Sequence, residues 1–212
     1  MKVIFRFVAA MLSGLLLSLC SPSVMAQQTY PVRPIRLVVP YPPGGIGDTF
    51  ARALGQQLSE KLGQAVIVDN KPGASQIIGA EIVAKARPDG YTLFLGSLSS
   101  LVLNVGSRKH LPYDPVKDFA PVSLLFTTPL YLVVNPSLPV HSVADLVAYG
   151  KAHPGQLNFG SIGRGSSVHL TGEMFKADTG LDLGHVPYSG SVPADTALLG
   201  GQIQLMFDGG SI

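Results

Sequence analysis

Residues 40–48 read Pro-Tyr-Pro-Pro-Gly-Gly-Ile-Gly-Asp, and this stretch decides how the first part of the chain folds. An apolar, β-branched run from Ile35 to Val39 precedes it and has the length of a strand. After it, apolar residues recur every four positions, at Phe50, Leu54, Leu58 and Leu62. The order predicts a strand, a rigid turn and a helix that Gly63 ends.

The backbone of this turn favours a small anion as its ligand. Its three prolines lack N–H groups, whereas Gly44, Gly45 and Gly47 can adopt positive φ and let a ligand approach the main chain. We expect Asp48 to be the N-cap of the helix, whose first N–H groups and positive dipole end suit a carboxylate. The alternative is that the glycines and prolines only build a tight turn, which needs the same residues.

The first 26 residues are predicted to be a secretory signal peptide. Two basic residues precede an apolar run at 7–19 that is too short to span a bilayer, and Val24-Met25-Ala26 fits a cleavage site. A lipid anchor on Cys20 is the less favoured alternative, because Leu19 and not a small residue precedes it. We therefore expect a mature periplasmic protein that begins at Gln27.

The composition of the mature chain excludes several classes of function. The signal removes two of the 15 basic residues and none of the 13 acidic ones, which leaves a formally neutral protein. This balance gives no support to nucleic acid or an anionic membrane surface as a partner. The only cysteine lies in the signal, so disulfides and thiol catalysis are excluded from the mature chain. No apolar run in it is long enough to cross a membrane.

The rest of the chain continues as alternating strands and helices. A strand at 65–68, a helix at 77–86 and a strand at 91–95 complete a βαβαβ order, which implies a parallel sheet with right-handed crossovers. A connector of weak periodicity follows at 98–119. A second set of elements is then predicted, with strands at 122–126, 131–134, 157–160, 183–186 and 203–207 and helices at 142–152, 166–177 and 195–199.

The two sets of elements predict two α/β lobes, residues 27–100 and 101–212, that bind a ligand beyond the carboxyl ends of their strands. The second lobe repeats the glycine-rich turn at 160–167. There Gly163 and Gly165 supply flexible backbone, and Ser166 or Ser167 caps the next helix and offers a hydroxyl to a carboxylate. In the same lobe, Ser142 is the predicted N-cap of the helix at 142–152.

Motifs of enzymes and metal sites are weak in this sequence. The glycines match neither the dinucleotide-binding nor the P-loop pattern, and no Gly-x-Ser-x-Gly motif surrounds Ser161. His169 and Glu173 could share a metal, but two residues four apart more often form a contact on a helix surface. Arg164 either adds charge to the second loop or is solvated. His185 either lines a cleft or, as we favour, packs at a strand end.

Several blocks in a fixed order resemble one family. They are Tyr-Pro-Val-Arg-Pro-Ile-Arg at 30–36, Pro-Pro-Gly-Gly at 42–45 with Asp48, Asp-Asn-Lys-Pro-Gly-Ala at 69–74, Pro-Asp-Gly-Tyr-Thr-Leu at 88–93, Gly-Arg-Gly-Ser at 163–166 with His169-Leu170, His-Val-Pro-Tyr at 185–188 and Met-Phe-Asp at 206–208. Over essentially all of its mature length, the chain is similar to the periplasmic substrate-binding receptors of the tripartite tricarboxylate transporter family, also called Bug receptors.

This resemblance implies an α/β, two-lobed periplasmic-binding-protein fold of the Venus-flytrap type (type II), without catalysis, metal or cofactor. The receptor captures a small carboxylate and delivers it to the membrane permease subunits of the transporter. Carried onto this sequence, the residues that hold the ligand are Pro43, Gly44, Gly45 and Asp48 opposite Gly165, Ser166 and Ser167. Further candidates for the wall of the site are Ser97, Tyr188, Gly190 and Asp208. We expect a monomer.

The sequence departs from the family in one respect. Family members continue well past the Met-Phe-Asp block, so we expect a truncated chain whose first lobe is incomplete because it lacks its C-terminal return segment. Two alternative functions stay open. One is an enzyme of small carboxylates that uses His169, Glu173 and Asp208, and the other is a sensor module for a signalling partner. Backbone amides recognise a carboxylate whatever is attached to it, so its identity is not predicted.

Overall fold

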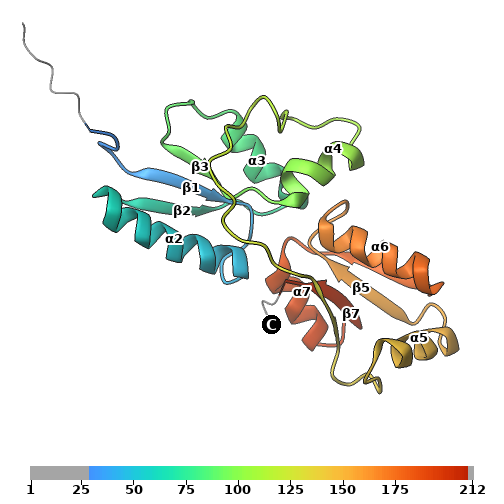
Figure 1. Cartoon of the computed structure of the whole chain (residues 1–212). Helices are drawn as coiled ribbons and strands as arrows, with labels where there is room; N and C mark the ends of the chain where they lie inside the picture. The colour runs from blue at the N-terminus through green and yellow to red at the C-terminus, as the bar shows by residue number, and fades with distance from the viewer. Residues whose placement is uncertain (1–28, 210–212) are drawn as a thin grey trace, which may run out of the picture. The chain divides into compact units, whose positions relative to one another are not determined.

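Two β-sheets with their helices make up the described part of the chain, residues 29–209 of a computed structural model (Figure 1). Both sheets belong to the same compact unit, which begins at Arg33. The predicted signal peptide and the start at Gln27 lie outside the described residues. Among the helices that are described, none is long and apolar enough to span a membrane.

The first sheet is parallel and has the strand order β2-β1-β3, as the βαβαβ pattern predicted. Its strands are β1 (Ile35–Val39), β2 (Val66–Asn70) and β3 (Thr92–Phe94), and its crossover helices are α2 (Ile46–Leu62) and α3 (Ile77–Ala84). Leu37 and Val39 of β1 are buried against Ala51 of α2. The intervening Val38 is also fully buried, which is typical of a central parallel strand.

Helix α2 packs on the sheet through small residues. Gly47, Ala51 and Gly55 are buried on the face that contacts the sheet. The apolar residues predicted to recur every four positions are only partly buried, and Leu62 is 37% exposed. A Cβ added at Gly55 would lie 3.5 Å from the Val66 carbonyl oxygen, so the helix approaches β2 closely. Gly63 ends the helix in the left-handed conformation and donates its N–H to Ser59 O, as predicted.

The second sheet has the order β4-β7-β5-β6, with β4 antiparallel to β7 and the other neighbours parallel. Its strands are β4 (Tyr131–Val134), β5 (Leu157–Ser161), β6 (Leu183–Pro187) and β7 (Leu205–Asp208). Its helices are α5 (Val143–Ala152), α6 (Ser167–Thr179) and α7 (Ser191–Leu199).

Helices cover both faces of this second sheet. Phe159 and Leu205 are fully buried in a cluster that includes Leu146 of α5. On the opposite face, Met206 packs with Ala194 and Leu198 of α7. The alternation along β7 therefore sends successive side chains into two different cores.

The predicted strand at 122–126 is wrong. No described strand pairs with this segment, and Val122 and Leu124 are 88% and 82% exposed. The connector that was predicted at 98–119 contains two short helical segments, η2 (Ser99–Leu103) and α4 (Asn104–Ser107). Two of their apolar residues, Val102 and Val105, are more than half exposed. Sequence periodicity could not reveal them, because Ser99, Ser100 and Asn104 form the buried side instead.

Segments η2 and α4 pack beside a third short helical segment, η1 (Ala74–Gln76), which follows β2. They therefore lie with elements that surround the first sheet. The lobe boundary after residue 100 stays a prediction.

The N-cap of α5 permits a first stability prediction. Ser142 Oγ accepts from the N–H of Asp145, whose carboxylate accepts from the N–H of His141 in return. We expect Ser142→Ala to lower the free energy of unfolding by about 1 kcal/mol, because one helix N–H loses its acceptor. Urea unfolding measures the change. Ser123→Ala is the matched control, since the exposed Ser123 hydroxyl bonds only to the next carbonyl, and an equal loss there would contradict a capping role.

Candidate functional site

The loop between β1 and α2 is organised by Asp48, though not in the way the sequence predicted. The N-cap is Gly45, whose extended backbone starts the helix at Ile46, so Asp48 is the third helical residue. Its carboxylate is buried and accepts from Gly44 N at 2.9 Å, Asn70 Nδ2 at 2.8 Å and Arg52 Nε at 2.9 Å. Asp48 therefore stabilises the conformation of this loop through hydrogen bonds.

No side chain caps the N-terminus of α2. The N-cap residue is Gly45, which has no side chain to bond to the helix. Of the three glycines expected to use positive φ, only Gly44 does so, at 91°. Pro43 and Gly44 are exposed. The first N–H groups of α2 therefore have no side-chain cap, and anion binding by this loop stays a prediction.

The residues nearest to this loop from the second lobe belong to the start of α7. Gly190, the N-cap of α7, also makes no side-chain cap bond, and a Cβ added to it would overlap the ring of Pro42. Val192 Cγ2 lies 3.9 Å from the Cβ positions of Gly44 and Gly45. Two uncapped helix N-termini, those of α2 and α7, therefore lie next to each other.

The glycine-rich turn of the second lobe, Gly163–Ser167, satisfies most of its own polar groups. Ser166 is the N-cap of α6: its buried Oγ accepts from His169 N and donates to Gly163 O. Ser167 N donates to Ser99 Oγ at 3.0 Å. A Cβ at Gly165, which has φ 82°, would lie 2.7 Å from Ser107 Oγ. Ser99 of η2 and Ser107 of α4 are thus close neighbours of this turn.

Two further residues that sequence reasoning missed bind the same turn. Ser75 Oγ donates to the carbonyl oxygen of Arg164 at 2.6 Å, and Arg108 Nη2 donates to it at 2.8 Å. Both bonds are thus made to the backbone carbonyl of Arg164, and the residue is exposed. The sequence could have indicated Ser75, since it follows the carboxyl end of the strand β2, and α/β sheets bind ligands at such ends.

The remaining predicted wall residues lie at strand ends. Ser97 follows β3 and donates its hydroxyl to Gln76 Oε1. Tyr188 follows β6, donates its N–H to Ser161 O at 2.8 Å and packs against the core under α7. Asp208 is buried at the end of β7, opposite Tyr131. The structure brings these residues to the carboxyl ends of the parallel strands, and their contact with a ligand stays a prediction.

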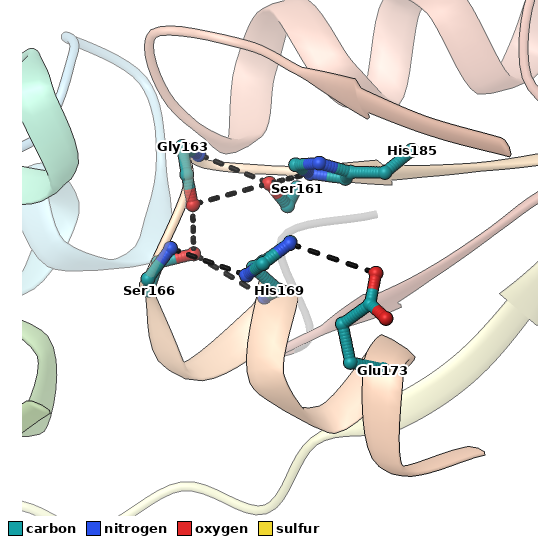
Figure 2. A network of polar contacts seen from close by, with 7 residues as sticks. Ser161, Gly163, Ser166, His169, Glu173 and His185 are labelled. Carbon is teal, nitrogen blue, oxygen red and sulfur yellow. Dashed lines mark hydrogen bonds and ion pairs between the residues drawn. The ribbon is translucent and has the colours of Figure 1, made fainter. Parts of the chain in front are cut away.

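A pair of histidines lies beneath the second turn (Figure 2). The ring centroids of His169 and His185 are 4.1 Å apart, and the His185 ring packs against buried Phe159, as we predicted for it. His169 Nδ1 accepts from Gly165 N at 3.1 Å, so its proton resides on Nε2, which faces a Glu173 oxygen at 3.7 Å. The described residues contain no group of three side chains suited to a metal.

Ser161 and His185 resemble the first two members of a hydrolase triad but lack its other features. Ser161 Oγ lies 2.7 Å from His185 Nε2. Ser161 is fully buried, its Oγ also accepts from Gly163 N, and His185 Nδ1 has no hydrogen-bond partner in the described structure. An activated serine needs an accessible oxygen and a third group that orients the histidine. This pair is therefore arranged to support the turn.

The histidine pair predicts a loss of stability in mild acid. Burial lowers the pKa of His185 to about 4, with further lowering from the nearby charges of His169, Arg164 and Lys176. Between that value and about 6.5, the unfolded chain binds more protons than the folded one, so stability falls as the pH falls. We expect a loss of about 2 kcal/mol between pH 7 and pH 4.5, to which His169 also contributes, since burial lowers its pKa too.

Urea unfolding across this pH range tests the assignment. His185→Gln should flatten the pH dependence, because it keeps a polar group near Ser161 without a titrating ring. The exposed His110 provides the matched control, His110→Gln, which should leave the curve as in the natural chain. A His185→Gln variant that retains the full pH dependence would rule out His185 as its source.

The fold and these two turns define a periplasmic-binding-protein type of receptor, and comparison with known proteins gives the family. Residues 50–209 match the model of the tripartite tricarboxylate transporter family receptor, and the chain belongs to this family. It is 43% identical over 180 residues to Protein BugT of Bordetella pertussis. That match covers 84% of this chain and 55% of BugT, so the chain spans about half the length of this relative.

Solved structures show the same fold. The R. palustris protein Rpa4515 with adipate is 41% identical, with a TM-score of 0.82 over 84% of this chain and 60% of that one. MatC from Rhodopseudomonas palustris with bound malate is 35% identical, with a TM-score of 0.79 over 84% of this chain and 61% of that one. The predicted two-lobed α/β receptor fold is thereby confirmed.

Proposed function

We propose that this chain is the ligand-capturing part of a periplasmic receptor that binds a small carboxylate and presents it to a tripartite tricarboxylate transporter. The observation that carries the proposal is the approach of two uncapped helix N-termini, those of α2 and α7, through Pro42 and Gly190. Two such termini offer N–H donors and positive dipole ends to one carboxylate without a charged side chain. The Asp48 carboxylate is occupied by its own partners, the N–H of Gly44 and the amide of Asn70.

The similar structures support the class of ligand. One contains adipate and the other malate, which are both small dicarboxylates. The proposal includes a periplasmic location, a monomeric state, the transporter's membrane subunits as partners and no catalytic step. The enzyme and sensor alternatives are not favoured by any observation, since Ser161 is buried and the family is one of transporter receptors.

A thermal melt of the whole chain with adipate, malate and the uncharged diamide of adipate tests this proposal. A ligand at 100 times its dissociation constant stabilises the folded state by about 2.7 kcal/mol, which raises the melting temperature by several degrees. We expect at least one diacid to raise the melting temperature and the diamide to have no effect. A cooperative melt that neither acid shifts would contradict the proposal.

A further inference from the structure

The turn after β2 has an unusual backbone. Ala74, Ser75 and Gln76 are consecutive non-glycine residues with positive φ, at 49°, 55° and 73°. Non-glycine residues avoid this left-handed region, because adopting it costs about 1–2 kcal/mol per residue. The turn is held by the bond from Ser75 Oγ to the Arg164 carbonyl and by Asn104 Nδ2, which donates to Ser75 O at 2.9 Å. Such strain is concentrated at functional sites.

The consequence of this backbone is the position of the Gln76 side chain. Gln76 is only 3% exposed, and its Oε1 accepts from the Ser97 hydroxyl. The Ser97 hydroxyl also accepts from the Ser100 N–H at 3.4 Å, and in the structure it directs its proton to Gln76 Oε1, which orients the amide. Its Nε2 then has no hydrogen-bond partner among the described residues. A buried donor without an acceptor is costly, so natural proteins seldom retain one.

The surroundings of Gln76 indicate what this donor meets. Its neighbour Ser75 binds the second turn at Arg164, and Ser99, two residues beyond Ser97, binds the same turn at Ser167. Gln76 therefore follows one residue that contacts the Gly163–Ser167 turn, and its partner Ser97 belongs to the segment that supplies the other. An NH₂ group only donates, and so it selects an acceptor such as a carboxylate oxygen.

We propose that Gln76 is a ligand-contacting residue whose Nε2 donates to a carboxylate oxygen of the bound acid. This inference rests on the proposed function and adds to it a side chain that distinguishes acids by the position of their oxygens. The strained turn serves to aim the amide, and Ser97 is a positioning residue that fixes its orientation. A bound diacid can then meet backbone N–H groups at one end and Gln76 at the other.

Calorimetric titration of the whole chain with adipate and with malate tests the role of Gln76. We expect Gln76→Met, which keeps the length of the side chain, to weaken binding about tenfold, the usual effect of one hydrogen bond to a charged group. Gln76→Glu keeps the acceptor for Ser97 but puts a carboxylate where the donor was, and it should weaken binding further. The exposed Gln57 gives the control, Gln57→Met, which should bind like the natural chain.

Melting without ligand separates this role from a structural one. Gln76→Met removes an unsatisfied donor together with the acceptor of the Ser97 hydroxyl, which has Ser100 Oγ at 3.4 Å as a second neighbour. Its melting temperature without ligand should therefore change little, while its shift with adipate becomes smaller. Unchanged affinity in both Gln76 variants, or a loss of affinity that comes with an equal loss of stability without ligand, would overturn the inference. If the natural chain binds neither acid, the proposed function fails and this inference with it, whereas natural binding with unaffected variants excludes Gln76 alone.

Discussion

Asp48→Ala is expected to lower the free energy of unfolding by about 3 kcal/mol and to weaken carboxylate binding at least tenfold. The substitution removes a buried carboxylate that accepts from Gly44 N and Asn70 Nδ2, and hydrogen bonds to charged groups contribute about 1.5–3 kcal/mol each. Arg52 adds little, because its side chain is 54% exposed and regains water. Binding falls because Gly44 loses the bond that holds the loop before α2.

Two variants and a pH series show whether this loss arises from the buried carboxylate. Asp48→Asn should be intermediate, and Arg52→Ala should cost less than about 1 kcal/mol in urea unfolding. Burial acts to raise the pKa of Asp48, but hydrogen bonds from Arg52, Gly44 and Asn70 together with the Arg52 charge lower it. The contribution of Asp48 is therefore complete above about pH 4 and is lost as the pH falls through the lowered value. An Asp48→Ala variant with natural stability would refute the role of Asp48.

The sequence predicted those elements whose signals are local. The strand at 35–39, the helix that ends at Gly63 and the caps Ser142 and Ser166 depend on a few adjacent residues, and each is confirmed. Asp48 was misplaced by three positions because a glycine can also be an N-cap, and an acidic residue suits the first turn as well as the cap. Nothing in the sequence distinguishes the two placements.

The parts of the candidate site that depend on contacts between lobes were not predicted. Sequence reasoning placed Pro43 and Gly44 opposite Gly165 across a ligand, which stays a prediction. It did not indicate that Gly190 and Val192 lie next to the first turn and Ser107 next to Gly165. Gln76 was missed because its position depends on positive φ at three residues that normally avoid it. The burial of Ser99 and Asn104 likewise reverses the usual pattern, since their polar groups bind Ser167 and Ser75.

Gly190→Ala is expected to weaken carboxylate binding by tenfold or more with little change in the stability of the chain without ligand. Alanine fits the backbone there, since φ is 174°, which is extended. Its methyl group, however, would overlap Cδ and Cγ of Pro42, and a proline ring cannot rotate away. The two turns must then separate, and a carboxylate that needs both helix N-termini loses the donors of one of them, each hydrogen bond to a charged group contributing about 1.5–3 kcal/mol.

The clash also predicts a rescue. In Pro42→Ala/Gly190→Ala the ring atoms that block the methyl group are absent, so affinity for adipate or malate should recover toward that of Pro42→Ala alone, and the coupling of the two substitutions is read from a double-mutant cycle. Gly106→Ala is the control for an added methyl group, because a Cβ there meets nothing within 4 Å. Equal affinity of Gly190→Ala and the natural chain, or a double variant as weak as Gly190→Ala, would show that the ligand does not require the turns at Pro42 and Gly190 to approach.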